Sequence, residues 1–229
     1  SLTTAPELPA TTLASYCYDD MFYGCTSLKQ APELKAKTLA SNCYNYMFYN
    51  CTSLTTAPAL PATTLAYNCY QSMFWGCTSL TQAPALPATT LADYCYAYMF
   101  VNCTSLTTAP DLPATTLADS CYCGMFQGCS NLNYIKCLAT DMSATNCTRN
   151  WVNNGVSETG TFVKAADVFW TIGINGIPEG WIIKESNGYV KFTAEEANST
   201  IRLEKLSYYQ TFEYKTDSSD WTNMDTSTT

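Results

Sequence analysis

The sequence predicts a leucine-rich-repeat-like solenoid in which each 26-residue unit supplies one short strand and one short helix. Three observations lead to this fold class. The chain matches itself when it is shifted by 26 residues, apolar residues recur within each unit at helical spacing, and the last unit is degraded. A degraded terminal unit is what a solenoid needs to cover its last open face.

Five units fill residues 1–130 without an insertion, and a sixth, degraded unit begins at Asn131. Each unit opens with a leucine, and the stretch from Leu28 to Ala31 is the expected strand. Pro32 and its counterparts then remove a backbone donor and turn the chain. Four of the five units carry a second proline three residues later, whereas the unit that begins at Ser27 has Lys35 there.

The second half of each unit predicts a short helix, which spans residues 12–23 in the first unit. Leu13, Cys17, Met21 and Cys25 recur at four-residue spacing and form an apolar stripe. The residue that follows the predicted helix is always glycine or asparagine, the two types that best tolerate the left-handed conformation of a helix cap. These residues are Gly24, Asn50, Gly76, Asn102 and Gly128.

Composition changes after the degraded unit, which indicates three parts. We expect the solenoid over residues 1–155, a β-rich capping segment over residues 156–185, and the start of an incomplete β-sandwich-like domain over residues 186–229. Alternating apolar and polar residues predict strands in this C-terminal segment. The expected strands cover residues 161–164, 181–184, 189–192, 200–203 and 212–215, with a turn at 217–220.

Charge and residue counts exclude several classes of function. The formal net charge is −8 and no basic face is visible, so nucleic-acid binding is not expected. Histidine is absent, which removes the commonest general base and metal ligand. No apolar run is long enough to span a membrane. The chain opens inside the repeat pattern, so we expect it to be part of a longer or processed protein.

The cysteines predict packing rather than chemistry. Their spacing within a unit does not match the closely spaced pairs of zinc sites. Helical geometry would place the two cysteines of a unit about 12 Å apart, beyond the reach of a disulfide, and a helical layer also disfavours bonds between units. We expect a ladder of free thiols, with disulfides in an oxidising environment as the alternative. The ladder comprises Cys17, Cys25, Cys43, Cys51, Cys69, Cys77, Cys95, Cys103, Cys121 and Cys129.

Two adjacent acids, Asp19 and Asp20, look like a catalytic pair in isolation. The other units carry unrelated residues at these positions, which marks them as exposed. No nucleophile motif or base accompanies them, so we expect no enzyme activity, no catalytic residues, no cofactor and no metal.

Aromatic residues at variable positions indicate a binding surface. Stacking of the units would place them in rows on an outer face, and large aromatic side chains with a polar tip are typical of recognition surfaces. The alternative is that they only shield the inner layer. The candidate ligand-binding residues are Tyr23, Tyr49, Trp75, Tyr46, Tyr98, Tyr16, Tyr67 and Tyr94.

The repeated phrase MF-x-[GN]-C-[TS]-SL, followed by a turn bounded by proline, resembles the BspA-like leucine-rich repeats of bacterial surface proteins. The segment from Asn131 through Gly160 to Trp181 is similar to the end of such arrays. This resemblance implies a secreted or cell-surface protein without catalytic residues in its repeats. It also implies adhesion to a host or bacterial protein ligand. A carbohydrate-binding module of a surface glycan system and a structural stalk are the alternatives.

Overall fold

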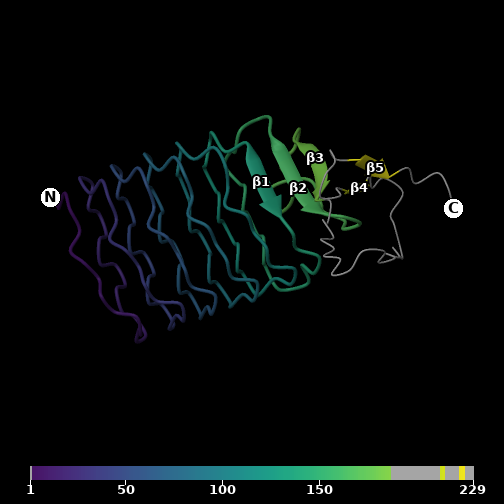
Figure 1. Ribbon diagram of the computed structural model, residues 1–229. Coiled ribbons are helices and arrows are strands. Elements are labelled where there is room, and N and C mark those ends of the chain that lie inside the picture. The colour runs from purple at the N-terminus through teal and green to yellow at the C-terminus, as the bar shows by residue number, and fades with distance from the viewer. Residues whose placement is uncertain (1, 187–211, 215–221, 225–229) are drawn as a thin grey trace. The chain divides into compact units, whose positions relative to one another are not determined.

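The computed structural model describes residues 2–186, 212–214 and 222–224. The chain divides into two compact units, Ser1–Ser186 and Asn187–Thr229. In the first unit, successive coils of the chain lie side by side from the N-terminus to a small parallel sheet (Figure 1). This arrangement is a solenoid, as the 26-residue period predicts.

The strand side of the solenoid is regular only at its C-terminal end. Strands β1 (Tyr134–Cys137), β2 (Thr161–Ala165) and β3 (Ile182–Ser186) form a parallel sheet in the order β1-β2-β3. In the earlier units the expected strand is reduced to isolated parallel bridges, such as Thr4↔Gln30 and Gln30↔Thr56.

Proline explains this difference between the units. Pro32 and its counterparts follow the bridge residue by two positions and cannot donate a ladder hydrogen bond. The sixth unit has Lys136 at that position, and there the backbone continues as β1. The strand expected at residues 28–31 was therefore wrong in extent, and a ladder strand forms where the proline is absent.

The predicted helices were wrong, because none of the described residues lies in a helix. The second half of each unit is instead a run of tight turns in which every fourth residue has a positive φ. Such a residue interrupts an α-helix each time. In five of the units these residues are Asn42, Tyr46 and Asn50; Asn68, Ser72 and Gly76; Tyr94, Tyr98 and Asn102; Ser120, Gly124 and Gly128; and Asn146, Asn150 and Asn154.

Backbone hydrogen bonds in this layer alternate between two directions. Met47 N–H donates back within its own unit to the Tyr44 carbonyl at 3.4 Å, while Phe48 N–H donates to the Met73 carbonyl of the next unit at 2.9 Å. Each unit therefore bonds directly to its neighbour through this layer. These inter-unit bonds satisfy donors that a helix would have kept within one segment.

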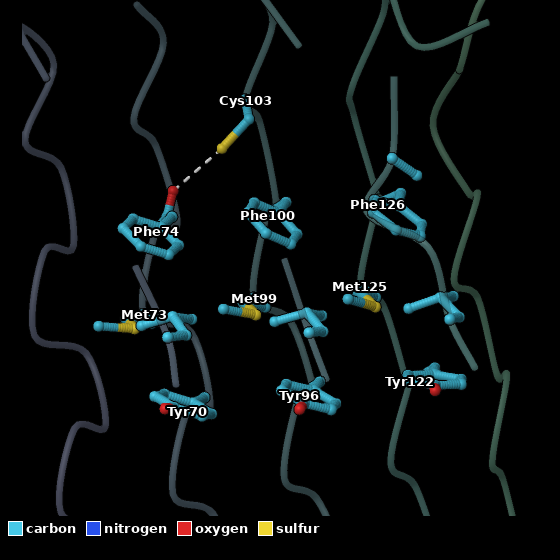
Figure 2. Packing of buried hydrophobic residues seen from close by; sticks show 14 of the residues in the cluster. Tyr70, Met73, Phe74, Tyr96, Met99, Phe100, Cys103, Tyr122, Met125 and Phe126 are labelled. Carbon is cyan, nitrogen blue, oxygen red and sulfur yellow. Dashed lines mark hydrogen bonds between the residues drawn. The ribbon is translucent and has the colours of Figure 1, made fainter. Parts of the chain in front are cut away.

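The core consists of columns of identical side chains that run along the stack (Figure 2). Phe48, Phe74 and Phe100 stack with ring centroids 5.6 Å apart, and Tyr70 and Tyr96 stack at 5.8 Å. The columns use an apolar pair repeated every four residues. This four-residue recurrence of the buried pair is why the pattern resembled a helical stripe.

Trp151 closes the aromatic columns in the degraded unit. It occupies the position of a repeated Met and is fully buried. Its ring lies 6.4 Å from Tyr122 and 6.0 Å from Phe126, and its Nε1–H donates to the Gly176 carbonyl at 2.7 Å. On its other side it stacks on Trp170 at 5.5 Å.

The expected strands at residues 161–164 and 181–184 are confirmed as β2 and, with a shift of one to two residues, β3. In the second unit, β4 (Phe212–Tyr214) matches the strand expected at 212–215 and pairs antiparallel with β5 (Thr222–Met224). The strands expected at 189–192 and 200–203, the turn at 217–220 and most of the sandwich proposed for 186–229 lie outside the described residues. The division of the first unit at residue 155 stays a prediction.

Candidate binding surface

Five of the candidate aromatic residues form one continuous surface, which we call the aromatic band: Tyr23, Tyr46, Tyr49, Trp75 and Tyr98. The rings of Tyr23 and Tyr49 are parallel within 2°, with centroids 4.7 Å apart. Trp75 follows at 5.6 Å from Tyr49 and Tyr98 at 5.9 Å from Trp75. Tyr46 joins from within its own unit, 5.7 Å from Tyr49. The band therefore crosses four consecutive units.

The turn geometry places these rings on the outside. Tyr46 and Tyr98 lie at the positive-φ corners of their units, with φ of 50° and 57°. Tyr23 is 54% exposed because it belongs to the first unit, while the other four rings are half-buried against their neighbours. Partial burial, with the nearby Tyr23 and Tyr46, raises the pKa of Tyr49. Its hydroxyl is therefore neutral at physiological pH.

Cys123 and Gly124 end the band at the fifth unit. The Tyr98 ring lies over Gly124 and leaves no room for a Cβ there. The Cys123 Sγ donates to Tyr98 Oη at 3.4 Å, and this contact together with burial raises the pKa of Tyr98 to about 12. Sequence reasoning missed this role of both residues. The sequence signal for this role was that the fifth unit has Cys-Gly at the two positions where the other units have larger pairs of residues.

The other three candidate tyrosines lie apart from the band. Tyr67 and Tyr94 form an edge-to-face pair at 5.7 Å and are 49% and 36% exposed. Tyr16 is 65% exposed. Within the described residues, no ring contact links these three to the aromatic band. The sequence therefore predicted one set of rows, while the structure has a five-ring band and a separate pair.

All thirteen cysteines are free thiols in the structure. Within the ladder, Cys17 and Cys25 are half-buried and the other eight are buried. In one column each thiol donates to a phenylalanine carbonyl of the preceding unit, as Cys103 does to Phe74 at 3.1 Å (Figure 2). Cys77 makes the same contact with Phe48 at 3.1 Å.

The helical argument against disulfides does not apply, because the cysteine layer is not helical and its units are joined by backbone hydrogen bonds. The redox state of the ladder therefore stays a prediction. Burial raises the pKa of Cys43 to about 11 and of Cys51 to about 12, which keeps these thiols protonated and unreactive at neutral pH.

The two adjacent acids of the first unit differ in their exposure. Asp20 is exposed, but the prediction that Asp19 is exposed was wrong, because Asp19 is half-buried and its counterparts Asn45 and Ala97 are buried. Burial together with the Asp20 charge raises the pKa of Asp19. Over the residues that the structure describes, no three His, Cys, Asp or Glu side chains come together in a way that could hold a metal ion. Over the same residues, no helix is long and apolar enough to cross a membrane.

Comparison with known proteins identifies the repeats. The family model of the BspA type leucine rich repeat region matches in six copies over residues 7–133, which is more than half of the chain. No curated protein and no solved structure matches the chain. This family is generally associated with surface binding proteins and is typically non-catalytic. The chain belongs to the BspA-type leucine-rich repeat family.

Proposed function

We propose that this protein is a non-enzymatic binding protein of the cell surface or the secreted fraction, and that its aromatic band contacts a host or bacterial protein ligand. The observation that carries the proposal is the continuity of the band. Five aromatic rings from four units contact one another on the outside of a scaffold whose core columns are fully packed.

The stacking of the rings favours a protein ligand over a glycan. A sugar ring packs on an open aromatic face. The neighbouring rings of Tyr23 and Tyr49 cover one face of each other, and Trp75 packs against Tyr49 from the next unit. Apart from the outer face of Tyr23, which no other ring of the described residues covers, the band therefore offers mainly ring edges and the hydroxyl groups of its tyrosines. Tyr and Trp edges with polar tips are enriched where proteins bind proteins.

Rigidity supports the same conclusion. Each ring of the band belongs to a unit whose backbone is hydrogen-bonded to the next unit, for example Tyr46 N–H to the Gln71 carbonyl at 2.9 Å. The backbone is therefore held in place before binding, and the tyrosine and tryptophan side chains have only two χ angles each, so that ordering them on binding costs little conformational entropy.

The test is a triple substitution, Tyr23→Ser, Tyr49→Ser and Trp75→Ser, assayed against immobilised host matrix proteins, whole bacterial cells and a glycan array. The matched control is Tyr16→Ser, Tyr67→Ser and Tyr94→Ser, which also removes three outer aromatic side chains but leaves the band intact. We expect the first variant to lose binding to the protein or cell ligand by at least about 10-fold and the control to retain it.

Thermal melting of both variants checks that the solenoid is still folded. Binding of the wild type to a defined glycan, lost in either variant, would replace the proposal with the carbohydrate-binding alternative. Unchanged binding in the first variant would overturn the role of the aromatic band, and failure of the wild type to bind any of these ligands would support a structural stalk.

A further inference from the structure

Basic residues are concentrated in one repeat unit. The only lysines or arginines of residues 1–130 are Lys29, Lys35 and Lys37, and all three belong to the unit that begins at Ser27. The other units carry threonine at the first and third of these positions and proline at the second. Three basic replacements in one unit of an otherwise acidic chain mark a local departure from the scaffold.

Two of these lysines line a groove between the first and second units. The groove has a volume of about 430 Å³, and Lys35 and Lys37 line it together with the hydroxyl-bearing Thr11, Thr12 and Thr38. Lys29 is not among its lining residues. Leu13 and Leu39 complete the lining, so the groove combines two ammonium groups and three hydroxyl groups with the apolar side chains of two leucines.

Both lysines point outward from the stretch that leads to a bend at Lys37. Exposure alternates along it, with Leu34 and Ala36 buried and Lys35 and Lys37 exposed. Alternate residues of an extended chain lie on the same side and about 6.6 Å apart. The two ammonium groups therefore leave the backbone from one side of the chain, two residues apart.

The charge of these lysines is largely available to a ligand. Lys35 lies 3.5 Å from Glu33, but both side chains are exposed, and such pairs are weak and screened by salt. Glu7 lines the adjoining smaller hollow together with Lys35. Within residues 2–186, no carboxylate forms an ion pair with Lys37.

We propose that this groove binds an extended acidic segment of a protein partner, with Asp or Glu at alternate positions. Carboxylates two residues apart on an extended peptide have the same spacing as the origins of Lys35 and Lys37. The threonine hydroxyls can donate to the carbonyl groups of such a segment. The site is separate from the aromatic band and does not depend on it.

The test uses the substitutions Lys35→Pro and Lys37→Thr together, which install the residues that the other units carry and so preserve the scaffold. The matched control is Lys29→Thr with Lys184→Thr, which removes the same charge from exposed positions outside the groove. The probe is a synthetic peptide of alternating aspartate and threonine. A peptide of the same composition, with its aspartates in one block, tests the spacing.

We expect the wild type to bind the alternating peptide more tightly than the block peptide, and added salt to weaken this binding. The groove variant should bind at least about fivefold more weakly, and the control within about twofold of the wild type. The aromatic-band variant should bind this peptide normally, so that failure of this proposal and failure of the proposed function are distinguishable.

Equal loss in the control variant would overturn the proposal, since it would show a general charge effect. Equal binding of the two peptides would contradict the proposal that the groove selects carboxylates at alternate positions. Failure of the wild type to bind either peptide, combined with binding of polygalacturonate that depends on the groove lysines, would show that the groove takes an acidic polysaccharide instead.

Discussion

The side-chain Oδ1 of Asn50 fills the space beside the α-carbon of Gly76 that a Cβ would need. The same relationship recurs two units later, where the Asn102 side chain covers Gly128. Glycine and asparagine alternate along this column because each asparagine side chain packs against the α-carbon of the residue in the next unit, which leaves room only for glycine. The column consists of Gly24, Asn50, Gly76, Asn102 and Gly128. Both residue types also tolerate the positive φ that the turn requires.

We predict that Gly76→Ala lowers the free energy of unfolding by about 3 kcal/mol, as measured by urea denaturation. Part of this loss comes from the φ of +72°, which an L-residue adopts at a cost of about 1 kcal/mol, and the rest comes from displacement of Asn50. Gly24→Ala is the matched control, since Gly24 has a φ of +67° but nothing within 4 Å of the added Cβ. It should cost about 1 kcal/mol.

A second change separates the two contributions. When Asn50→Gly is added to Gly76→Ala, the free energy of unfolding should recover most of the difference between the two alanine variants. The added change removes the side chain of Asn50 that the new Cβ displaces, but it leaves the backbone strain at residue 76. Equal destabilisation by Gly76→Ala and Gly24→Ala would show that the contact has no energetic role.

The repeat period, the family resemblance and the inward-facing residues could all be predicted from sequence, because each unit repeats the same apolar pattern. The local conformation could not. A spacing of four residues was interpreted as a helical stripe, yet a helix repeats every 3.6 residues. A strict four-residue spacing, with Asn or Gly frequent at one position of the four, is the signature of the observed turns.

The ring contacts of the candidate site could not be predicted from the repeat period, because they depend on the size of the side chains in the adjacent unit. The sequence indicated that Tyr23, Tyr49 and Trp75 share a column, and these residues do contact their neighbours. Tyr98 joins that column because Gly124 leaves space for its ring, whereas Tyr16, Tyr67 and Tyr94 lie elsewhere. Side-chain size in the adjacent unit thus decided which rings came together.

Thiol accessibility provides a test of the cysteine ladder. We expect a thiol reagent to label Cys17 and Cys25 of the first unit first in the native protein, because these two thiols are half-buried and the other eleven are buried. Cys77 and Cys103 should stay protected until the chain unfolds, since they are buried and donate to carbonyl groups. Peptide mapping by mass spectrometry identifies the labelled residues. Labelling of Cys103 as fast as Cys17, or missing thiols after unfolding without reductant, would contradict the arrangement.

Alkaline pH should destabilise the solenoid. Burial raises the pKa of Cys43 from its ordinary 9.0 to about 11, and that of Cys69 to about 12. Above pH 9 the unfolded chain loses protons that the folded chain retains, so the free energy of unfolding falls. The stabilisation is complete below pH 9 and is lost as pH rises through 11 to 12.

Each thiol shifted in this way contributes a slope of up to about 1.4 kcal/mol per pH unit. Urea denaturation in the presence of a reductant, repeated between about pH 7 and pH 11, measures this dependence. Stability that stays constant to pH 11 would show that the thiols are ionised or hydrated in the folded state.

The tyrosine column contains hydroxyl groups whose removal should stabilise the protein. The Tyr96 ring stacks between Tyr70 at 5.8 Å and Tyr122 at 6.1 Å, and its buried Oη has no hydrogen-bond partner. A buried polar group without a partner costs about 1–3 kcal/mol. We therefore expect Tyr96→Phe to raise the free energy of unfolding by about 1 kcal/mol.

The control for this prediction is Tyr98→Phe, because Tyr98 Oη accepts a hydrogen bond from the Cys123 thiol and its removal should give no gain. Urea denaturation of both variants, at a pH below the thiol pKa values, provides the comparison. A loss of stability in Tyr96→Phe would mean that the hydroxyl makes a hydrogen bond in solution, and the column would then hold a polar partner within its core.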